Sequence, residues 1–127
     1  MSKIFQFGAN ALLHTNDFDA TDDVVETVAA DVLVIPVTHG FVSKTSGADA
    51  EALTLANGVP GQLLVVSVTT AGGGACTLTP ATKTGWATVV LTVVGDTAVL
   101  LFVNEVVGWV LLNTMGTAVA LDPLWTV

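Results

Sequence analysis

The 127-residue chain has no arginine and no tyrosine, and only three lysines stand against eleven acidic residues, which gives a net charge of −8. Proteins that bind nucleic acids contact phosphates through clustered Lys and Arg, so this composition excludes direct DNA or RNA binding. Charged residues of both signs make up only 11% of the chain, against 52% apolar residues. With so few charged side chains to cover the surface, we expect part of it to be hidden against other protein subunits.

Cysteine is also scarce: the single Cys76 excludes an internal disulfide, and no nearby Cys or His gives it metal-site spacing. We expect it to be a small buried hydrophobic residue. Mean hydropathy is high, at +0.76, but Thr, Gly or Asp interrupts every apolar run well before the roughly 18 residues of a membrane-spanning helix. The N-terminal sequence lacks the apolar core of a secretory signal. We therefore predict no membrane partner and synthesis in a cytoplasm.

Short β-branched runs, separated by glycine-centred turns, fill the last two-thirds of the chain. The runs 87–94, 97–103 and 108–112 are separated only by short turns, which predicts an antiparallel meander. Further strands are expected at 31–37, 41–44, 51–56, 62–69, 75–79 and 117–121. About eight or nine strands at this spacing predict an all-β fold, an antiparallel β-sandwich or barrel of jelly-roll-like type.

The first 25 residues show no sustained period of two and hold most of an acidic cluster. The acids between positions 17 and 31 are Asp17, Asp19, Asp22, Asp23, Glu26 and Asp31. We predict an irregular N-terminal arm at 1–25 and a single β domain at 26–127. A short helix within 22–30, capped by Thr21 or Asp22, is the alternative at the junction.

Residue types that carry catalysis or bind metals are few and poorly spaced. Neither His14 nor His39 has a Ser, Cys or carboxylate partner at the spacing of a triad or zinc site. The run Gly72–Gly74 lacks the Lys-Ser/Thr of a phosphate-binding loop, so we expect a flexible hairpin loop. The acidic run 17–23 lacks the pattern of a calcium loop, which leaves weak divalent-ion binding as the alternative to a solvated arm. We expect no enzyme activity, no cofactor and no metal site.

Three tryptophans offer a different kind of site, because indole rings can stack on sugars. Trp109 lies inside an apolar run and Trp86 begins another, where an indole packs well with its N–H near a backbone carbonyl. For these residues and Trp125 we favour packing in the core or an interface. A carbohydrate-binding surface is the alternative.

Glycines, threonines and a tryptophan form a distinctive string between Gly61 and Asn113. Its parts are Gly61-Gln62, Thr77-Leu-Thr-Pro-Ala-Thr82, Gly95-Asp96-Thr97, Leu100-Leu-Phe102 and Gly108-Trp109. This string resembles a class of tailed-bacteriophage virion proteins in which it forms a compact β domain of head-decoration (cement) or fibre proteins. The resemblance implies a structural role, most often as a homotrimer, and it carries over no catalytic residue.

The function expected from these features is capsid decoration. The oligomer would bind the major capsid protein on the virion exterior and stabilise the shell, after assembly in the host cytoplasm. A receptor- or carbohydrate-binding fibre or tail domain is the alternative. The residues expected to contact the capsid lie in the arm, which could add a strand to a neighbour's exposed sheet edge. They are Lys3, Ile4, Phe5, Phe7, Asp17, Asp19, Asp22 and Asp23.

Overall fold

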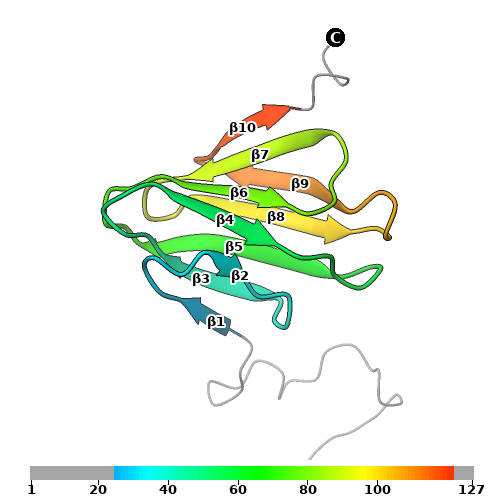
Figure 1. The fold of residues 1–127 in the computed structure, drawn as a ribbon, viewed down its shortest axis with the longest axis horizontal. Coiled ribbons are helices and arrows are strands. Elements are labelled where there is room, and N and C mark those ends of the chain that lie inside the picture. The colour runs from blue at the N-terminus through cyan, green and yellow to red at the C-terminus, as the bar shows by residue number, and fades with distance from the viewer. Residues whose placement is uncertain (1–24, 122–127) are drawn as a thin grey trace, which may run out of the picture.

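In the part of the chain that the structure describes, ten β-strands form two open five-stranded sheets that pack face to face (Figure 1). The computed structural model describes residues 25–121. The strands are β1 (Val25–Val28), β2 (Val34–Ile35), β3 (Phe41–Thr45), β4 (Glu51–Leu55), β5 (Leu63–Thr70), β6 (Cys76–Pro80), β7 (Trp86–Leu91), β8 (Thr97–Phe102), β9 (Trp109–Met115) and β10 (Ala118–Leu121). The predicted all-β sandwich is confirmed, in its open rather than its closed form. Within 25–121 there is no helix that could cross a membrane.

The strand order shows that the chain alternates between the two sheets from β1 to β6. The first sheet has the order β1-β3-β5-β8-β9 and the second the order β10-β7-β6-β4-β2. Strands β1, β3 and β5 pair in parallel, as do β2, β4 and β6, whereas the pairs that involve β7, β8, β9 and β10 are antiparallel. Parallel neighbours require a crossover connection. Here the crossover is a strand of the opposite sheet, so the sheets are mixed where antiparallel pairing was predicted.

The meander predicted for 87–112 is correct only for its second half. Strands β8 and β9 form an antiparallel pair, but β7 lies in the other sheet. Asp96 shapes this crossing, because its Oδ2 accepts hydrogen bonds from the N–H groups of Thr92 (2.8 Å) and Val93 (3.0 Å). The tight turn bends the chain at the end of β7, and Thr97 then enters the first sheet.

The junction near residue 30 also differs from the prediction. Residues 25–30, where a short helix was the alternative, form β1 and the start of a turn. Asp31 has a φ of +66° in this turn, and the Val32 N–H donates to the Ala29 carbonyl at 3.2 Å. Of the strand expected at 31–37, only Val34–Ile35 pairs, at the edge of the second sheet. Pro36 directly follows it, as expected for a residue that cannot donate to a ladder.

The loop Gly72–Gly74 joins β5 to β6 in the other sheet, so it is not the hairpin that was predicted. It packs tightly on the loop after β3: the Gly74 N–H donates to the Gly47 carbonyl at 2.9 Å. A Cβ on Gly74 would lie 2.0 Å from the Asp49 carbonyl oxygen. Glycine is needed here for a close backbone approach.

The core is built from the inward-facing alternate residues of both sheets. Its largest members are Trp109, Phe102, Ile35, Leu53, Leu55, Leu64, Leu78, Leu91 and Leu100, each less than 2% exposed. The Phe102 and Trp109 rings meet edge to face, with centroids 5.3 Å apart and an interplanar angle of 66°. Cys76 is fully buried among these residues, which confirms its expected place.

Candidate functional site

The outer face of the first sheet carries two apolar rows that run across the strands. In one row Leu63 lies opposite Leu101, which lies opposite Val110. In the other, Val25, Phe41, Val65 and Val99 are aligned, and the row ends at the polar Asn113 on β9. These positions alternate with the buried residues of the same strands, so their side chains point away from the core. The sheet is therefore apolar on both of its faces.

A row of hydroxyl groups borders the apolar rows on the same face. Thr27, Ser43, Ser67 and Thr97 occupy one aligned row on β1, β3, β5 and β8. The Ser67 and Thr97 hydroxyls lie 2.9 Å apart, and the Thr97 hydroxyl donates to the Gly95 carbonyl at 2.8 Å. These contacts satisfy the Ser67 and Thr97 hydroxyls, and the Ser43 hydroxyl lies 2.6 Å from that of Thr69, so a partner could cover these residues without leaving their hydroxyls unpaired.

We call these three rows together the outer face of the first sheet. None of the residues in the three rows is charged. Leu63 is 54% exposed and Val25 is 45% exposed, while the other apolar members shield one another and are half-buried. The second sheet presents mostly Ala and Thr instead: its outward residues are Val34, Ala52, Thr54, Thr77, Thr79, Thr88, Val90, Ala118 and Ala120. An apolar partner would therefore bind the outer face of the first sheet in preference to that of the second sheet.

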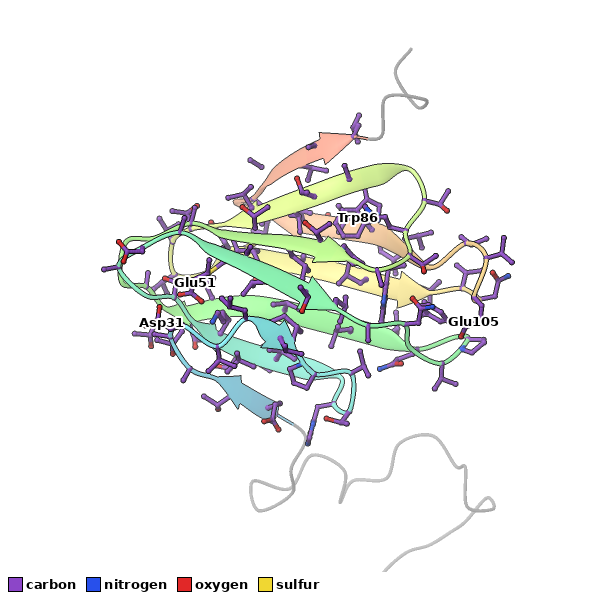
Figure 2. The ribbon with its side chains drawn as sticks, viewed as in Figure 1. Asp31, Glu51, Trp86 and Glu105 are labelled. Atoms are coloured by element: carbon purple, nitrogen blue, oxygen red, sulfur yellow. The ribbon has the colours of Figure 1, made fainter. Side chains whose placement is uncertain are left out.

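At one end of the sandwich a fully buried Lys44 pairs with Glu51. The Lys44 Nζ lies 2.7 Å from Glu51 Oε1 and donates to the carbonyls of Ala29 and Val32, both at 2.8 Å. Glu51 Oε2 accepts the Gly47 N–H. Figure 2 shows Asp31 and Glu51 at this end of the molecule. The pair therefore ties the β1–β2 turn to strands β3 and β4.

Electrostatics at this pair favour the charged carboxylate. Burial alone would raise the pKa of Glu51, but hydrogen bonds from Lys44 and from the backbone of Gly47 and Asp31 outweigh it, and the pKa lies below its usual value. Because all three Lys44 donors have an acceptor, the ammonium is held by a complete set of partners. The arrangement suits a structural clamp rather than a nucleophilic amine.

The strand alternation in the sequence carries a signal for this pair. Lys44 is in phase with Val42 in β3, and Glu51 is in phase with Leu53 in β4, at a period of two. That phase places both charges on the buried faces of their strands. Two opposite charges on buried faces separated by a short loop are expected to pair, since an unpaired buried charge is very costly.

The two described tryptophans are core residues. Trp86 is 2% exposed and donates its indole N–H to the Trp109 carbonyl at 3.0 Å. Trp109 is fully buried, and its indole N–H donates to the Ala56 carbonyl at 2.9 Å. The preferred interpretation of these two residues is confirmed, and neither ring is free to stack on a sugar. Trp125 lies outside the described residues.

Residues with metal-binding potential are not brought together between positions 25 and 121. No group of three or more His, Cys, Asp or Glu side chains in this range could hold a metal ion. His39 contacts the Thr38 hydroxyl at 2.9 Å and Glu26 Oε1 at 3.5 Å. Burial raises the pKa of the Cys76 thiol, and the nearby Glu51 carboxylate adds to this effect.

The predicted capsid-contact residues lie outside the described part of the chain. These are Lys3, Ile4, Phe5, Phe7, Asp17, Asp19, Asp22 and Asp23. His14, considered above for a triad or zinc site, also lies outside the described residues. The structure therefore does not test the arm, and its capsid contacts stay a prediction. Comparison with protein-family models and with curated proteins found no match to this chain.

Proposed function

We propose that this chain is a structural protein of a bacteriophage virion, a decoration or cement protein that binds the capsid exterior as a homotrimer. The observation that carries the proposal is the uncharged, largely apolar outer face of the first sheet. The sequence resemblance between Gly61 and Asn113 supports the virion assignment. In this function the chain has no catalytic role, and its partners are copies of itself and the major capsid protein.

The area of the outer face of the first sheet limits how much of a subunit interface it can supply. Five strands spaced about 4.8 Å apart, each about five residues long, cover a footprint of roughly 400 Å². A standard protein interface buries about 800 Å² on each partner. The face therefore supplies part of a stable subunit interface, and the N-terminal arm supplies the remainder by adding contacts on a neighbouring subunit or on the capsid.

Cementing then follows from mass action. A trimer that sits where several capsid subunits meet binds only the assembled lattice, so its binding energy stabilises that state over dissociated subunits. The acidic residues of the arm, from Asp17 to Asp23, favour contact with basic groups of the shell. Lys3 to Phe7 can add a strand to a neighbour's sheet edge.

The test places a charge on the apolar face. We expect the wild-type protein to be a trimer by light scattering across a range of concentrations, and to co-sediment with expanded capsids that lack it. Leu63→Glu should shift the molar mass toward that of a monomer and weaken co-sedimentation, because the exposed Leu63 would carry an uncompensated charge into the interface.

Thr79→Glu is the matched control, because Thr79 is exposed on the outer face of the second sheet. This variant should remain a trimer. A wild-type protein that stays monomeric, or a Leu63→Glu protein as oligomeric as Thr79→Glu, would refute the assembly role of this face.

A further inference from the structure

A trimer that uses the outer face of the first sheet needs a second, different surface on each subunit. A contact between two copies of the same surface is isologous and closes as a dimer, whereas a three-membered ring joins two different surfaces head to tail. The two surfaces must also lie on adjacent sides of the subunit, because a contact between opposite faces builds an open stack. The outer face of the second sheet is therefore excluded as the second surface.

The two loop ends of the sandwich are poor candidates for the second surface, because both expose carboxylates. Asp49 lies in the β3–β4 loop at one end, and Glu105 lies in the β8–β9 loop at the other. Burial of a carboxylate against an apolar face is costly unless the charge is paired. The two open sides of the sandwich, at β1 and β2 and at β9 and β10, are left.

The edge of the second sheet at β2 carries a run of exposed apolar side chains. Val32, Leu33 and Val34 are 46%, 43% and 63% exposed, and no charged residue occurs from Val32 to Val37. We call residues 32–34 the β2 edge segment. It lies at the same open side as β1 (Figure 1), whose Val25 ends an apolar row of the outer face of the first sheet. This side therefore joins an apolar edge to the apolar face.

Hydrogen bonds hold the backbone of the β2 edge segment in place. Lys44 Nζ donates to the carbonyls of Ala29 and Val32, both at 2.8 Å, and the Leu33 carbonyl accepts the Thr54 N–H at 2.8 Å. Because these carbonyls already have donors, a partner could cover the segment without leaving them unpaired. A surface that is fixed before binding also loses little conformational freedom when it is covered.

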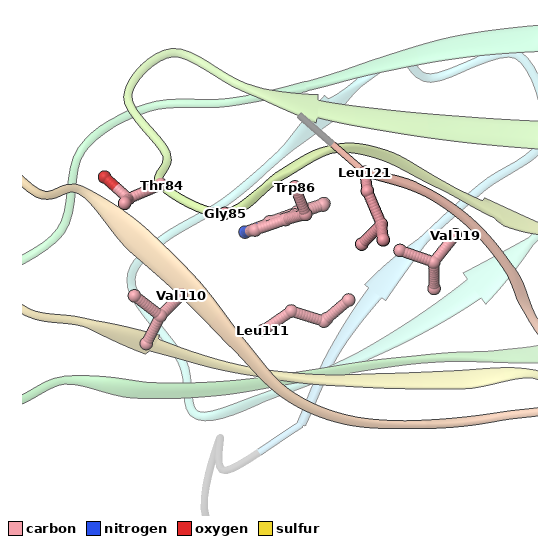
Figure 3. A pocket seen from close by; sticks show the side chains of 7 residues that line it. All are labelled: Thr84, Gly85, Trp86, Val110, Leu111, Val119 and Leu121. Atoms are coloured by element: carbon pink, nitrogen blue, oxygen red, sulfur yellow. The ribbon is translucent and has the colours of Figure 1, made fainter. Parts of the chain in front are cut away.

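The other open side, at β9 and β10, has a different shape. Among the described residues, an apolar cavity of about 340 Å³ opens there between the two sheets, with Trp86, Leu111 and Leu121 in its walls (Figure 3). The outer face of the first sheet is a continuous surface of side chains, so packing it over this opening would leave a void. Residues around a void lose their packing contacts on that side. The side at β2 is therefore the better fit.

We propose that the outer face of the first sheet of one copy packs against the β2 edge segment of the next copy around the trimer. This inference rests on the proposed function. A single contact through the face covers roughly 400 Å², too little for a stable dimer. In the ring each subunit makes two such contacts, one through its face and one through its edge, which together reach the roughly 800 Å² of a standard interface before the arm adds to it.

The test uses pairs of introduced cysteines in the full-length protein and a short bifunctional maleimide. Cys76 is fully buried, so the introduced thiols are the reactive ones. The double variant Leu33→Cys/Leu63→Cys should give covalent dimers and trimers on a denaturing gel. Each single variant should give only single chains, because like positions are far apart in a head-to-tail ring.

Leu112→Cys combined with Leu63→Cys is the matched control, because Leu112 is 52% exposed and lies on β9 at the other open side. It should give only single chains. Light scattering adds a second measurement: Leu33→Glu should shift the molar mass toward that of a monomer, whereas Leu112→Glu should remain a trimer. Circular dichroism checks that each variant is folded.

The outcomes separate this inference from the proposed function. Covalent dimers from Leu63→Cys alone would show a face-to-face contact and overturn the inference. Links in the Leu112→Cys/Leu63→Cys control, or a Leu33→Glu protein that stays a trimer, would also overturn it. A trimeric wild type whose Leu33→Cys/Leu63→Cys variant is not linked overturns the inference alone, whereas a monomeric wild type overturns the assembly role as well.

Discussion

At the scale of single residues, the buried pair of Lys44 and Glu51 is the feature with the largest expected energetic consequence. Both side chains are almost fully removed from solvent, and each makes contacts beyond the pair itself. A buried ion pair does not by itself imply high stability, because desolvation of the two charges offsets their attraction. Removal of one partner is different, since the remaining charge keeps its desolvation cost and loses its counter-charge.

We therefore expect Lys44→Met to lower the free energy of unfolding by about 3–5 kcal/mol. Glu51→Gln should be destabilising in the same direction, and the double variant should lose less than the sum of the two. Urea unfolding monitored by circular dichroism provides the three values.

Lys83→Met serves as the control, because Lys83 is only half-buried and its one hydrogen bond, to the Pro80 carbonyl, is 3.5 Å long. Its cost should be within about 1 kcal/mol, as for most surface substitutions. A Lys44→Met protein as stable as Lys83→Met would show that the Lys44–Glu51 pair contributes nothing to the free energy of unfolding.

At the scale of elements, the sequence predicted where most strands lie but not which sheet each one joins. Strands β3 to β9 fall close to their predicted ranges, because period-two alternation and glycine turns determine strand position. A run such as Thr97–Phe102 shows the same alternation whether the strand before it pairs with it or lies across the core. The short Gly95-Asp96 connection was consistent with a hairpin, but the structure places β7 and β8 in different sheets, so the chain crosses between them here.

The apolar character of the outer face of the first sheet was also partly predictable from the sequence pattern of single strands. The run Leu63–Val66 has no polar residue, which indicates a strand that is apolar on both faces. The alignment of Val25, Phe41, Val65 and Val99 in one row could not be predicted, because it depends on parallel registers set by crossovers through the other sheet.

Gly108 offers a test of how the β8–β9 connection is held. It has a φ of +74°, and a Cβ there would lie 2.2 Å from the Thr82 carbonyl oxygen. Gly108→Ala should therefore cost more than the roughly 1–3 kcal/mol of backbone strain alone, because the segment before β7 must also move away from β9. Differences in urea midpoint between this variant and the wild type measure the cost.

Gly95→Ala isolates the strain, since Gly95 has a similar φ of +98° with no atom within 4 Å of an added Cβ. Its loss of stability should be the smaller of the two. Equal losses would mean that the packing of Gly108 on Thr82 has no energetic weight.

At the scale of the whole molecule, the two outer faces and the two open sides differ in character. The first sheet presents Val, Leu and Phe beside a row of Ser and Thr, whereas the second presents mostly Ala and Thr, with Val90 and the edge residue Val34. The side at β1 and β2 is tied by Lys44 and Glu51, whereas the side at β9 and β10 holds the apolar cavity. This asymmetry would orient a subunit in an assembly, because only one face favours an apolar partner.

Acid should lower the stability of the sandwich by protonating Glu51 in its pair with Lys44. The direction of this pH dependence follows from the lowered pKa of Glu51. Its ordinary value is 4.5, and the folded value is lower, so below about pH 4.5 the unfolded chain binds a proton that the folded chain resists. The stabilisation is therefore complete above this pH and is lost as the pH falls through the folded pKa.

The measurement compares urea midpoints of the wild type and Glu51→Gln at pH 7, 5, 4 and 3. The repulsion among the other acidic groups of this net-negative chain is nearly the same in both proteins, so it cancels in the difference. We expect the wild type to be the more stable at pH 7 and its advantage to shrink between pH 5 and 3. An advantage that is constant or grows toward acid would mean that Glu51 is not held as a carboxylate by Lys44 in the folded protein.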